Sequence, residues 1–230
     1  MRPKVGEFPV LPGSAEKFEV SSVEKIEIPR KTLYRLSIYL RCLEELGTDG
    51  VETVSSDELA EKAGVKSTQL RKDLGHVGQF GTRGLGYNVR TLDEALSGVM
   101  GQKHLQPVIL VGLGNLGAAL LHYGGFRKEG FEIIAAFDAD PEAVSHRAED
   151  IGVPVRDAEE LGQYVRLHEV KMAILAVPQA VAQDVADTLV AAGLEAILNF
   201  SPTVLRVPDN VIVNHVDLAA ELESLRYFVS

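Results

Sequence analysis

A glycine-rich turn in the second half of the chain has the spacing of a site that binds a pyrophosphate. Gly112, Gly114 and Gly117 follow the apolar run 107–111 and precede the apolar segment 118–121. In such a turn the first glycine permits the bend, the second lets the backbone approach a pyrophosphate, and the third lets helix and strand pack closely. The phosphates then meet amides at the positive end of the helix dipole. The spacing therefore predicts a strand, a tight turn and a helix that bind a dinucleotide.

An acidic residue stands where the ribose of a bound adenosine is expected. Asp138 follows the apolar run 133–137 and comes 26 positions after Gly112, close to the spacing of about 20 that is typical of such sites. A carboxylate there accepts hydrogen bonds from the ribose hydroxyls and repels the additional phosphate of NADP. We therefore expect NAD or NADH as the ligand. A coenzyme A-binding regulatory domain would share the glycine turn but would gain nothing from Asp138.

Strand and helix patterns alternate through the rest of the chain. The expected strands are 107–111, 133–137, 153–155, 171–177, 196–200 and 211–213, and the last two helices are 178–192 and 217–228. This alternation predicts an α/β fold with a Rossmann-like, doubly wound parallel sheet that binds ligands at the carboxyl ends of its strands. The candidate walls for the nicotinamide half lie at such ends: Val177, Pro178, Asn199, Phe200 and Ser201.

A catalytic site has little support in the sequence. An NAD-dependent oxidoreductase needs a proton donor or acceptor beside the nicotinamide and a pocket for its substrate. His215 near Asp217 is the best candidate for that role, but an isolated histidine at a strand end is more often structural. The single cysteine, Cys42, cannot form an internal disulfide or a zinc site built from thiolates. We therefore expect no catalytic residue and no metal, and keep the oxidoreductase as the alternative function.

Positive charge gathers in one segment of an acidic chain. The net charge of −10 argues against nucleic-acid binding when it is taken as a single number. Residues 91–230, however, carry nine basic and twenty acidic side chains, whereas residues 66–90 carry five basic side chains against one acidic side chain. Affinity for phosphate backbones depends on such local clusters. The segment 66–90 is therefore a candidate surface for DNA, with a solvated basic face as the alternative.

Three helices are expected around this basic segment. Pro29 can open a helix that Gly47 ends, and leucines recur along it at three- and four-residue spacing. Ser55 and Glu58 form a capping box that starts a second helix. Ser67 can cap a third helix after a turn that contains glycine. Helix, short turn and helix form the helix-turn-helix motif.

The third helix and the glycine-rich segment after it have the features of a DNA-reading surface. The outward positions of the helix hold Gln and Arg, which can read base edges, and Lys, which binds phosphates. The glycines of segment 81–87 suit a hairpin that projects an arginine, as the wing of a winged helix does. The candidate DNA contacts are Lys66, Ser67, Thr68, Gln69, Arg71, Lys72, Arg83 and Gly84.

Length and composition fit two domains of a globular protein. The 230 residues are 46% hydrophobic and 24% charged, which rules out disorder as the main state. We expect a leader over 1–26, a DNA-binding domain over 27–90, a nucleotide-binding domain over 91–215 and a terminal helix over 216–230. The leader lacks the apolar core of a signal peptide. The uncharged stretch 104–126 contains five glycines and reads as strand, turn and helix, so we expect a cytoplasmic protein with no membrane span.

The last helix carries an apolar stripe with no obvious partner in its own domain. Leu218, Leu222 and Leu225 form the stripe, and Tyr227 and Phe228 add bulk at its end. We expect this helix to pack on a partner subunit or on the amino-terminal block, which favours a homodimer. The alternative is that it covers its own sheet.

Six segments together resemble the Rex family of redox-sensing transcriptional repressors. They are 39–46, 69–74, 81–87, 111–117, 197–202 and 216–219, and the resemblance extends from about Ile26 to Phe228. It implies a homodimer in which each chain has a winged helix and a Rossmann domain and exchanges its last helix with its partner. It also implies repression from operator DNA, in the form of an inverted repeat, when NADH is scarce, and release when NADH binds.

The resemblance also assigns residues. It implies a recognition helix at 67–74, a wing at 81–87 and a pyrophosphate site at 112–117, which includes Leu113, Asn115 and Leu116. It places the adenosine ribose on Asp138. Finally, it implies that Arg41, Tyr123 and Asp217 form a switch between the domains, with Tyr123 also near the nucleotide.

Overall fold

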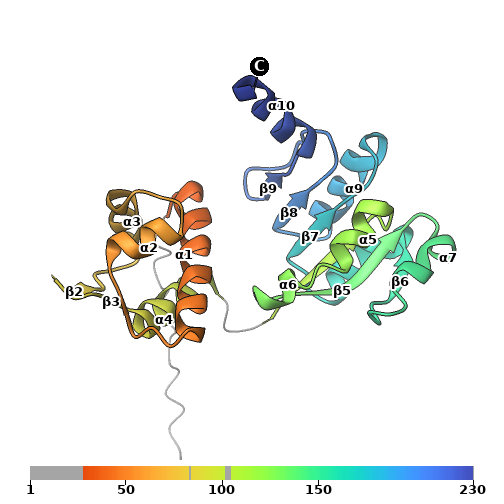
Figure 1. Cartoon of the computed structure of the whole chain (residues 1–230). Helices are drawn as coiled ribbons and strands as arrows, with labels where there is room; N and C mark the ends of the chain where they lie inside the picture. The colour runs from red at the N-terminus through yellow and green to blue at the C-terminus, as the bar shows by residue number, and fades with distance from the viewer. Residues whose placement is uncertain (1–27, 83, 102–104, 230) are drawn as a thin grey trace, which may run out of the picture. The chain divides into compact units, whose positions relative to one another are not determined.

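The computed structural model of the chain describes residues 28–82, 84–101 and 105–229. They form two compact units that divide between Leu96 and Ser97 (Figure 1). The first unit consists mainly of helices with a small antiparallel sheet, and the second is built on a parallel sheet. The expected leader, 1–26, lies outside the described residues.

The first unit is a winged helix-turn-helix. Its elements in chain order are α1 Arg30–Thr48, β1 Thr53–Val54, α2 Ser56–Lys62, α3 Ser67–Leu74, β2 Gly81–Thr82, β3 Gly86–Asn88 and α4 Val89–Met100. The strands form one antiparallel sheet in the order β1-β3-β2. Helices α2 and α3 pack against each other, and both pack on α1. This arrangement confirms the fold that the sequence predicts for the amino-terminal block.

Leucines at three- and four-residue spacing give the first unit its core. On α1, Leu36, Leu40 and Leu43 are fully buried, because this spacing puts them on one side of the helix. On α4, Leu92 and Leu96 are buried as well. The compact unit therefore extends to Leu96, past the boundary expected at residue 90, because the apolar side of α4 belongs to this unit.

The turn between α2 and α3 follows from local signals. The Ser55 hydroxyl accepts from the Glu58 N–H at 3.1 Å, and the Glu58 carboxylate accepts from the Ser55 N–H at 2.9 Å, so the expected capping box starts α2. Gly64 then takes φ +67°, a backbone conformation that favours glycine, and turns the chain toward α3.

Two helix ends differ from the expectation. Gly47 lies inside α1, and the left-handed glycine that follows this helix is Gly50, with φ +76°. Ser67 is the first residue of α3 and does not cap it. The capping position belongs to Lys66, because the chain is still extended there and becomes helical only at the next residue.

The second unit is a doubly wound parallel sheet. Its elements are β4 Gln106–Val111, α5 Asn115–Leu121, α6 Gly125–Lys128, β5 Phe131–Asp138, α7 Pro141–Val144, a 3₁₀ turn Ser145–Arg147, β6 Val155–Asp157, a 3₁₀ turn Ala158–Glu160, α8 Leu161–Leu167, β7 Met172–Leu175, α9 Gln179–Ala191, β8 Ala196–Asn199, β9 Ile212–His215 and α10 Leu218–Val229. All six strands are parallel, in the order β6-β5-β4-β7-β8-β9. The order reverses between β4 and β7, where sheets of this kind bind ligands. The predicted Rossmann-like fold is confirmed.

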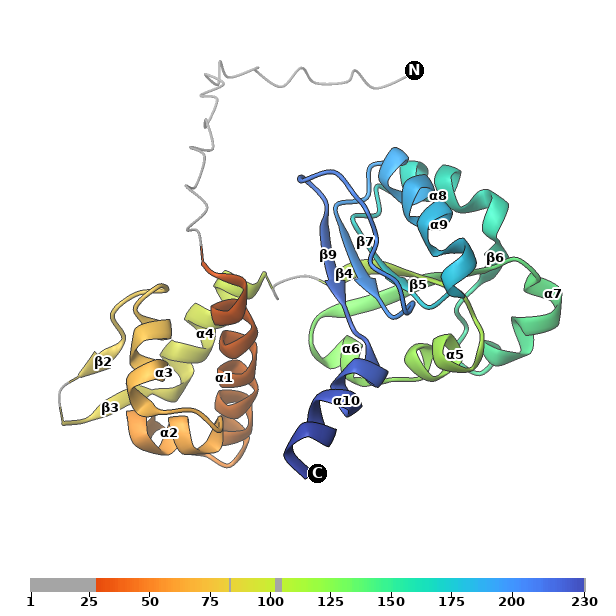
Figure 2. The same ribbon diagram turned by 90° about the horizontal axis from the view of Figure 1, so that it is seen from above.

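Helices cover both faces of the sheet (Figure 2). Helices α8 and α9 pack on one face, over a core that includes Ile109 and Phe137. Helices α5, α6 and α7 pack on the other face, over a core that includes Leu110 and Leu121. The glycine turn therefore lies in the middle of the layered structure, between β4 and α5.

Part of the second face is open within the described chain. A groove of about 250 Å³ lies there, bordered by apolar side chains that include Met172, Ile174, Leu198 and Ile212. None of the described residues of α10 is buried, and Leu222 is 70% exposed. Helix α10 therefore does not cover its own sheet, which removes that alternative for its apolar stripe. Within the described ranges, no helix has the length and apolar character that a membrane span requires.

Candidate functional site

The recognition helix presents polar and basic side chains to solvent. On α3, Thr68, Arg71 and Lys72 are exposed, whereas Leu70 and Leu74 are buried in the first unit. The helical period places these two sets on different sides of the helix. The exposed side therefore offers the residue types that bind phosphates and read base edges.

Serines from two helices hold the Arg71 side chain. Its Nη1 donates to the Ser56 hydroxyl at 2.7 Å, and its Nη2 donates to the Ser67 hydroxyl at 3.5 Å. A guanidinium has five N–H donors, so these contacts leave others for a ligand. Lys66, the residue before α3, is also exposed. The recognition helix thus carries an oriented arginine in its last turn and a lysine at its capping position.

Strands β2 and β3 form the hairpin expected as the wing. Gly86 has φ +83°, and a Cβ there would collide with the carbonyl oxygen of Val54 on β1, so this position requires glycine. Gly84 also has a positive φ, of +82°. A concave surface of about 570 Å³ includes the hairpin and Arg71. Arg83, the expected tip of the wing, lies outside the described residues.

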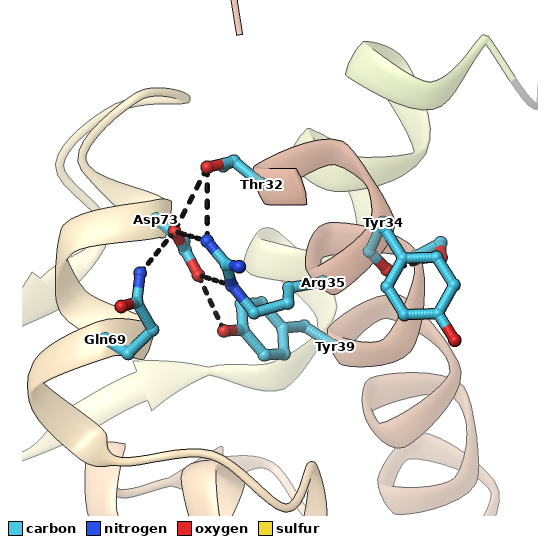
Figure 3. A network of polar contacts seen from close by, with 7 residues as sticks. Thr32, Tyr34, Arg35, Tyr39, Gln69 and Asp73 are labelled. Carbon is cyan, nitrogen blue, oxygen red and sulfur yellow. Dashed lines mark hydrogen bonds and ion pairs between the residues drawn. The ribbon is translucent and has the colours of Figure 1, made fainter. Parts of the chain in front are cut away.

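Gln69 turns toward the interior of the unit and does not share the outward side of α3. It is half-buried, and its amide nitrogen donates to Asp73 Oδ1 at 2.9 Å. Figure 3 shows that Asp73 is the centre of a network between α3 and α1. Arg35 donates from Nε to Oδ2 at 2.6 Å and from Nη2 to Oδ1 at 2.7 Å. The hydroxyls of Tyr39 and Thr32 donate at 2.8 and 3.3 Å.

The network fixes the ionisation of its members. Burial disfavours the charged form of Asp73, but the hydrogen bonds from Arg35, Tyr39 and Gln69 outweigh this cost and lower the pKa of Asp73 to about 2. The hydrogen bond to Asp73 raises the pKa of Arg35. Burial, followed by the hydrogen bond to Asp73, raises the pKa of Tyr39. At neutral pH a buried carboxylate therefore faces a guanidinium and a protonated phenol.

The three glycines between β4 and α5 do different things. Gly112 has φ +93°, and a Cβ there would collide with the carbonyl oxygen of Ala176. A Cβ at Gly117 would collide with the carbonyl oxygen of Gly112, so α5 approaches the turn too closely for a larger residue. A Cβ at Gly114 would meet no atom within 4 Å. The turn thus leaves open space before the amino end of α5, and a pyrophosphate fits such a space.

Asp138, the last residue of β5, closes the glycine turn from the neighbouring strand. Its Oδ2 accepts from the Leu113 N–H at 2.7 Å, and its Oδ1 accepts from the Asp140 N–H at 3.1 Å. Each carboxylate oxygen has more than one lone pair, so both can accept further hydrogen bonds. The carboxylate therefore fits the two hydroxyls of a ribose beside the turn.

Arg147, which the sequence analysis does not single out, also contacts the glycine turn. Its Nη1 donates to the Leu113 carbonyl oxygen at 3.3 Å and to Asn115 Oδ1 at 3.1 Å. Asn115 and Leu116 are themselves exposed at the start of α5. No local pattern distinguishes this arginine from other surface arginines, so only the fold reveals that it braces the turn and adds positive charge there.

The candidate wall for a nicotinamide lies at the carboxyl ends of β7 and β8. Asn199 is fully buried, and its Oδ1 accepts from the Ser201 N–H at 2.9 Å. The Ser201 hydroxyl donates to the Val177 carbonyl oxygen at 2.7 Å, which joins the two strand ends. Val177, Pro178 and Phe200 retain exposed surface. Asn199 and Ser201 therefore support the wall, and the other three can contact a ligand.

His215 takes part in the same support. Its Nδ1 lies 3.0 Å from the Asn199 amide nitrogen. That nitrogen also donates to the Ser201 and Thr203 carbonyl oxygens, at 3.2 and 2.9 Å. The histidine, at the end of β9, thus lies against the buried amide that supports the wall. Among the described residues, no three His, Cys, Asp or Glu side chains form a group that could hold a metal ion.

The three residues implied as a switch are divided between the two units. Arg41 is exposed on α1 of the first unit. Tyr123, in the second unit, is 59% exposed and packs edge-on against Phe126. Asp217 caps α10, because its Oδ1 accepts from the first two N–H groups that follow Leu218, at 3.0 and 3.1 Å. Each switch candidate is therefore accessible within its own unit.

Two family models match the chain, one over each unit. The model described as the N-terminus of putative DNA-binding proteins matches residues 27–75. The model described as a CoA binding domain matches residues 103–203. The first covers the helix-turn-helix, and the second covers most of the parallel sheet with its glycine turn.

A winged-helix unit and a dinucleotide-binding sheet on one chain define a ligand-responsive transcriptional regulator. The "Redox-sensing transcriptional repressor Rex" of Pelotomaculum thermopropionicum is 44% identical over 205 residues, which cover 89% of this chain and 95% of the relative. The protein of the same description from Carboxydothermus hydrogenoformans is 48% identical over 202 residues, covering 87% and 96%. The chain belongs to the Rex family of redox-sensing transcriptional repressors.

Crystal structures of RSP, a Rex-family repressor, have the same fold. RSP in complex with β-NAD⁺ and operator DNA matches with a TM-score of 0.80 at 37% identity, covering 88% of this chain and 93% of RSP. RSP in complex with β-NADH matches with a TM-score of 0.76 at 37% identity, covering 88% and 94%. The same two-unit fold therefore occurs in a repressor with a nucleotide ligand and, in one case, operator DNA.

Proposed function

We propose that this chain binds operator DNA through its first unit and NAD(H) through its second, and that NADH releases the DNA. The proposal rests on one observation, which is that two kinds of site occur on the same chain. A glycine turn whose Leu113 N–H donates to Asp138 accompanies a recognition helix that exposes Arg71 and Lys72. Such a protein would respond to the ratio of NADH to NAD by binding or releasing the operators of its target genes. The cytoplasm is its proposed location, because both ligands are met there.

The residues around the glycine turn suit NAD(H). Backbone amides of Gly112–Gly117 would hold the pyrophosphate, and Asp138 would accept from the ribose hydroxyls. The charge of Asp138 disfavours the additional phosphate of NADP(H). Coenzyme A, which the description of the second family model suggests, also carries a phosphate on its ribose and would meet the same repulsion.

The nicotinamide half would lie against Val177, Pro178 and Phe200, with Tyr123 nearby. The oxidised ring carries a positive charge that the reduced ring lacks, so the surroundings of the ring can favour one form. Asn199 and Ser201 would keep this wall in place through their contacts with the strand ends. We assign the wall to binding and not to turnover, because the chain's relatives are named as repressors.

DNA contacts would come from the recognition helix and the wing. The proposed residues are Lys66, Ser67, Thr68, Arg71, Lys72, Arg83 and Gly84, and Gln69 would act indirectly, through its hydrogen bond to Asp73. Lysines and arginines would bind phosphates, and Arg71 can also pair with a base edge. The local basic cluster supports this role despite the net charge of −10.

Two open apolar surfaces favour a homodimer. Leu222 and Leu225 on α10 are 70% and 58% exposed, and the groove that includes Ile174 and Leu198 is open. An α10 exchanged with a second copy of the chain would bury both surfaces together, and large open apolar patches usually mark such interfaces. A two-fold dimer presents two recognition helices related by that axis, so it would read an inverted repeat.

Release of DNA requires an element that senses both units. A ligand shifts an equilibrium only when it binds one arrangement more tightly than another. We assign this element to Arg41, Tyr123 and Asp217, because Asp217 connects the end of the sheet to the proposed exchanged helix. Asp217→Ala should then retain NADH binding and lose release of DNA by NADH. Unchanged release in this variant would remove Asp217 from the switch.

Operator binding titrated with nucleotides tests the proposed function. The duplex is the one that the full chain selects from a random-sequence library, and the titrants are NADH, NAD, NADPH and coenzyme A. We expect NADH to release the duplex at the lowest concentration. If saturating NADH leaves binding unchanged, the proposal is wrong. Turnover of a 2-hydroxy acid or an aldehyde at ordinary enzymatic rates would instead favour the NAD-dependent oxidoreductase.

A further inference from the structure

The buried Asp73 carboxylate joins two segments that are far apart in the sequence. It is 1% exposed and accepts from Arg35, Tyr39 and Thr32 of α1, which lie 34–41 positions before it. On its own helix it accepts from Gln69. Figure 3 shows the Arg35 fork against both carboxylate oxygens and the Tyr39 hydroxyl beside them. These contacts connect the recognition helix to the longest helix of the first unit.

Stability alone does not account for this network. The contacts keep Asp73 ionised, but burying a carboxylate costs free energy, and apolar residues of similar size often stabilise a core as well or better. A buried ion pair does, however, select one arrangement of the elements that it joins, because a shift of either partner leaves a charge unpaired. The two hydrogen bonds from Arg35 to Asp73 restrict the arrangement further, because both N–H donors must stay in line with the carboxylate oxygens.

The position of Asp73 on α3 connects this selection to DNA. A residue in an α-helix is turned about 100° from the one before it, so Arg71 lies roughly 200° around the helix from Asp73. Fixing Asp73 on the inside therefore fixes Arg71 on the outside. A rotation of about 20° would move a side-chain tip about 6 Å from the helix axis by about 2 Å, which is too far for a paired hydrogen bond to a base.

We propose that Asp73 is a specificity-determining positioning residue of the DNA site. Through its contacts with Arg35 and Tyr39 of α1 it holds the recognition helix in the one rotation that aims Arg71 and Lys72 at base edges. Phosphate contacts tolerate a rotated helix better, because charged side chains reach phosphates from many directions. The inference rests on the proposed function, and it separates the reading of a base sequence from general affinity for DNA.

The full-length protein tests this with Asp73→Asn, which removes the charge but keeps the size of the side chain. We measure its affinity for the duplex that the wild-type chain selects and for a scrambled duplex of the same composition, at two salt concentrations. Arg35→Lys is the second variant, because it keeps the charge and loses the fork. Asp49→Asn is the matched control, since Asp49 is an exposed carboxylate of the same unit.

In both variants the affinity for the selected duplex, divided by that for the scrambled duplex, should fall by roughly tenfold or more. A change of this size corresponds to losing the recognition of one base pair. Affinity for the scrambled duplex, its salt dependence and NADH binding should match those of the control. A ratio unchanged in both variants overturns the inference. So does an equal loss for both duplexes, because partial unfolding lowers the two affinities together. If Asp73→Asn does not fold, Arg35→Lys decides. A wild-type chain with no preferred duplex contradicts the proposed function itself.

Discussion

Asp138 meets Leu113 at the glycine turn: its Oδ2 accepts the Leu113 N–H at 2.7 Å, from a position 25 residues further along the chain. The contact joins the end of β5 to the turn that follows β4, and β4 is one of the two strands next to the point where the strand order reverses. It fixes the carboxylate beside the open space at Gly114. The turn and the carboxylate are therefore placed before a ligand arrives, which reduces the cost of binding.

Removing this carboxylate should change both affinity and preference. In Asp138→Ala the affinity for NADH should fall about tenfold or more, because hydrogen bonds to a charged group contribute roughly 1.5–3 kcal/mol each. The preference for NADH over NADPH should narrow, because the charge that repels the second phosphate is gone. Calorimetric titration with both nucleotides measures this. Asp187→Ala, at an exposed position of α9, is the control. An unchanged ratio of affinities would mean that Asp138 does not contact the ribose.

Arg147 should matter for the same ligand. Arg147→Ala removes the donors to the Leu113 carbonyl oxygen and to Asn115 Oδ1 together with a positive charge beside the turn. We expect NADH affinity to fall by about three- to tenfold, the usual effect of about 1 kcal/mol for one hydrogen-bonding group. Arg127→Ala is the control, because Arg127 is 71% exposed and pairs with Glu132. Equal affinities in the two variants would contradict a bracing role for Arg147.

Arg71 should affect the binding of operator DNA alone. In Arg71→Ala, operator affinity should fall by about 1–3 kcal/mol if the guanidinium pairs with a base, while NADH binding stays at the wild-type level. Fluorescence anisotropy with a labelled operator duplex measures the first quantity, and calorimetry measures the second. Arg90→Ala provides the comparison, since Arg90 is 87% exposed and pairs with Glu94. Wild-type operator affinity in Arg71→Ala would take this residue out of the interface.

Local sequence signals predict most of the fold, because they describe contacts between near neighbours. The capping box of Ser55 and Glu58 and the spacing of Gly112, Gly114 and Gly117 are complete within a few residues, and the structure contains them as expected. The parallel, doubly wound character of the sheet follows as well, since alternating strands and helices permit few arrangements.

Contacts between distant segments explain what the sequence analysis misses. The sequence analysis assigns Gln69 to the outward side of its helix, but its amide bonds to Asp73, and Asp73 is buried against Arg35, which lies 38 positions earlier. Arg147 contacts Leu113 across 34 positions. The unit boundary at Leu96 likewise depends on which core α4 joins. Helical and strand periods carry no information about such pairings.

The Asp73 network should make the first unit sensitive to acid. The pKa of the Asp73 carboxyl is about 2 in the folded state, below the value of about 3.9 in an unfolded chain. The contribution to stability is therefore fully present above about pH 4 and is lost as the pH falls toward 2, and it amounts to about 2 kcal/mol. Urea unfolding followed by circular dichroism between pH 5.5 and 2.5, roughly the range over which it titrates, checks this.

Asp73→Asn should remove that part of the pH dependence, whereas Asp49→Asn should keep it, because Asp49 lies outside the network. The free energy of unfolding of Asp73→Asn should be lower than that of the wild type at neutral pH, since Arg35 then lacks a charged partner. The two proteins should converge as the pH approaches 2. Parallel curves over the whole range would show that the Asp73 carboxylate is not the group that titrates.

Helix α10 provides the last prediction, because the described residues of its own unit do not cover its apolar side. Leu218, Leu222, Leu225 and Phe228 are each more than half exposed, and the open groove beside Leu198 offers a matching apolar surface. If a second copy fills each groove with its own α10, a chain that ends at Val216 loses both halves of the contact. We expect this truncated protein to be monomeric in sedimentation experiments at concentrations where the full chain is dimeric. It should keep NADH binding, because the glycine turn and Asp138 remain, and it should lose most of its operator affinity, because two half-sites are no longer bound together.

A milder variant, Leu222→Glu with Leu225→Glu, keeps the helix and its cap and should also be monomeric. Either protein remaining dimeric and still releasing its operator with NADH would place the dimer contact elsewhere on the chain.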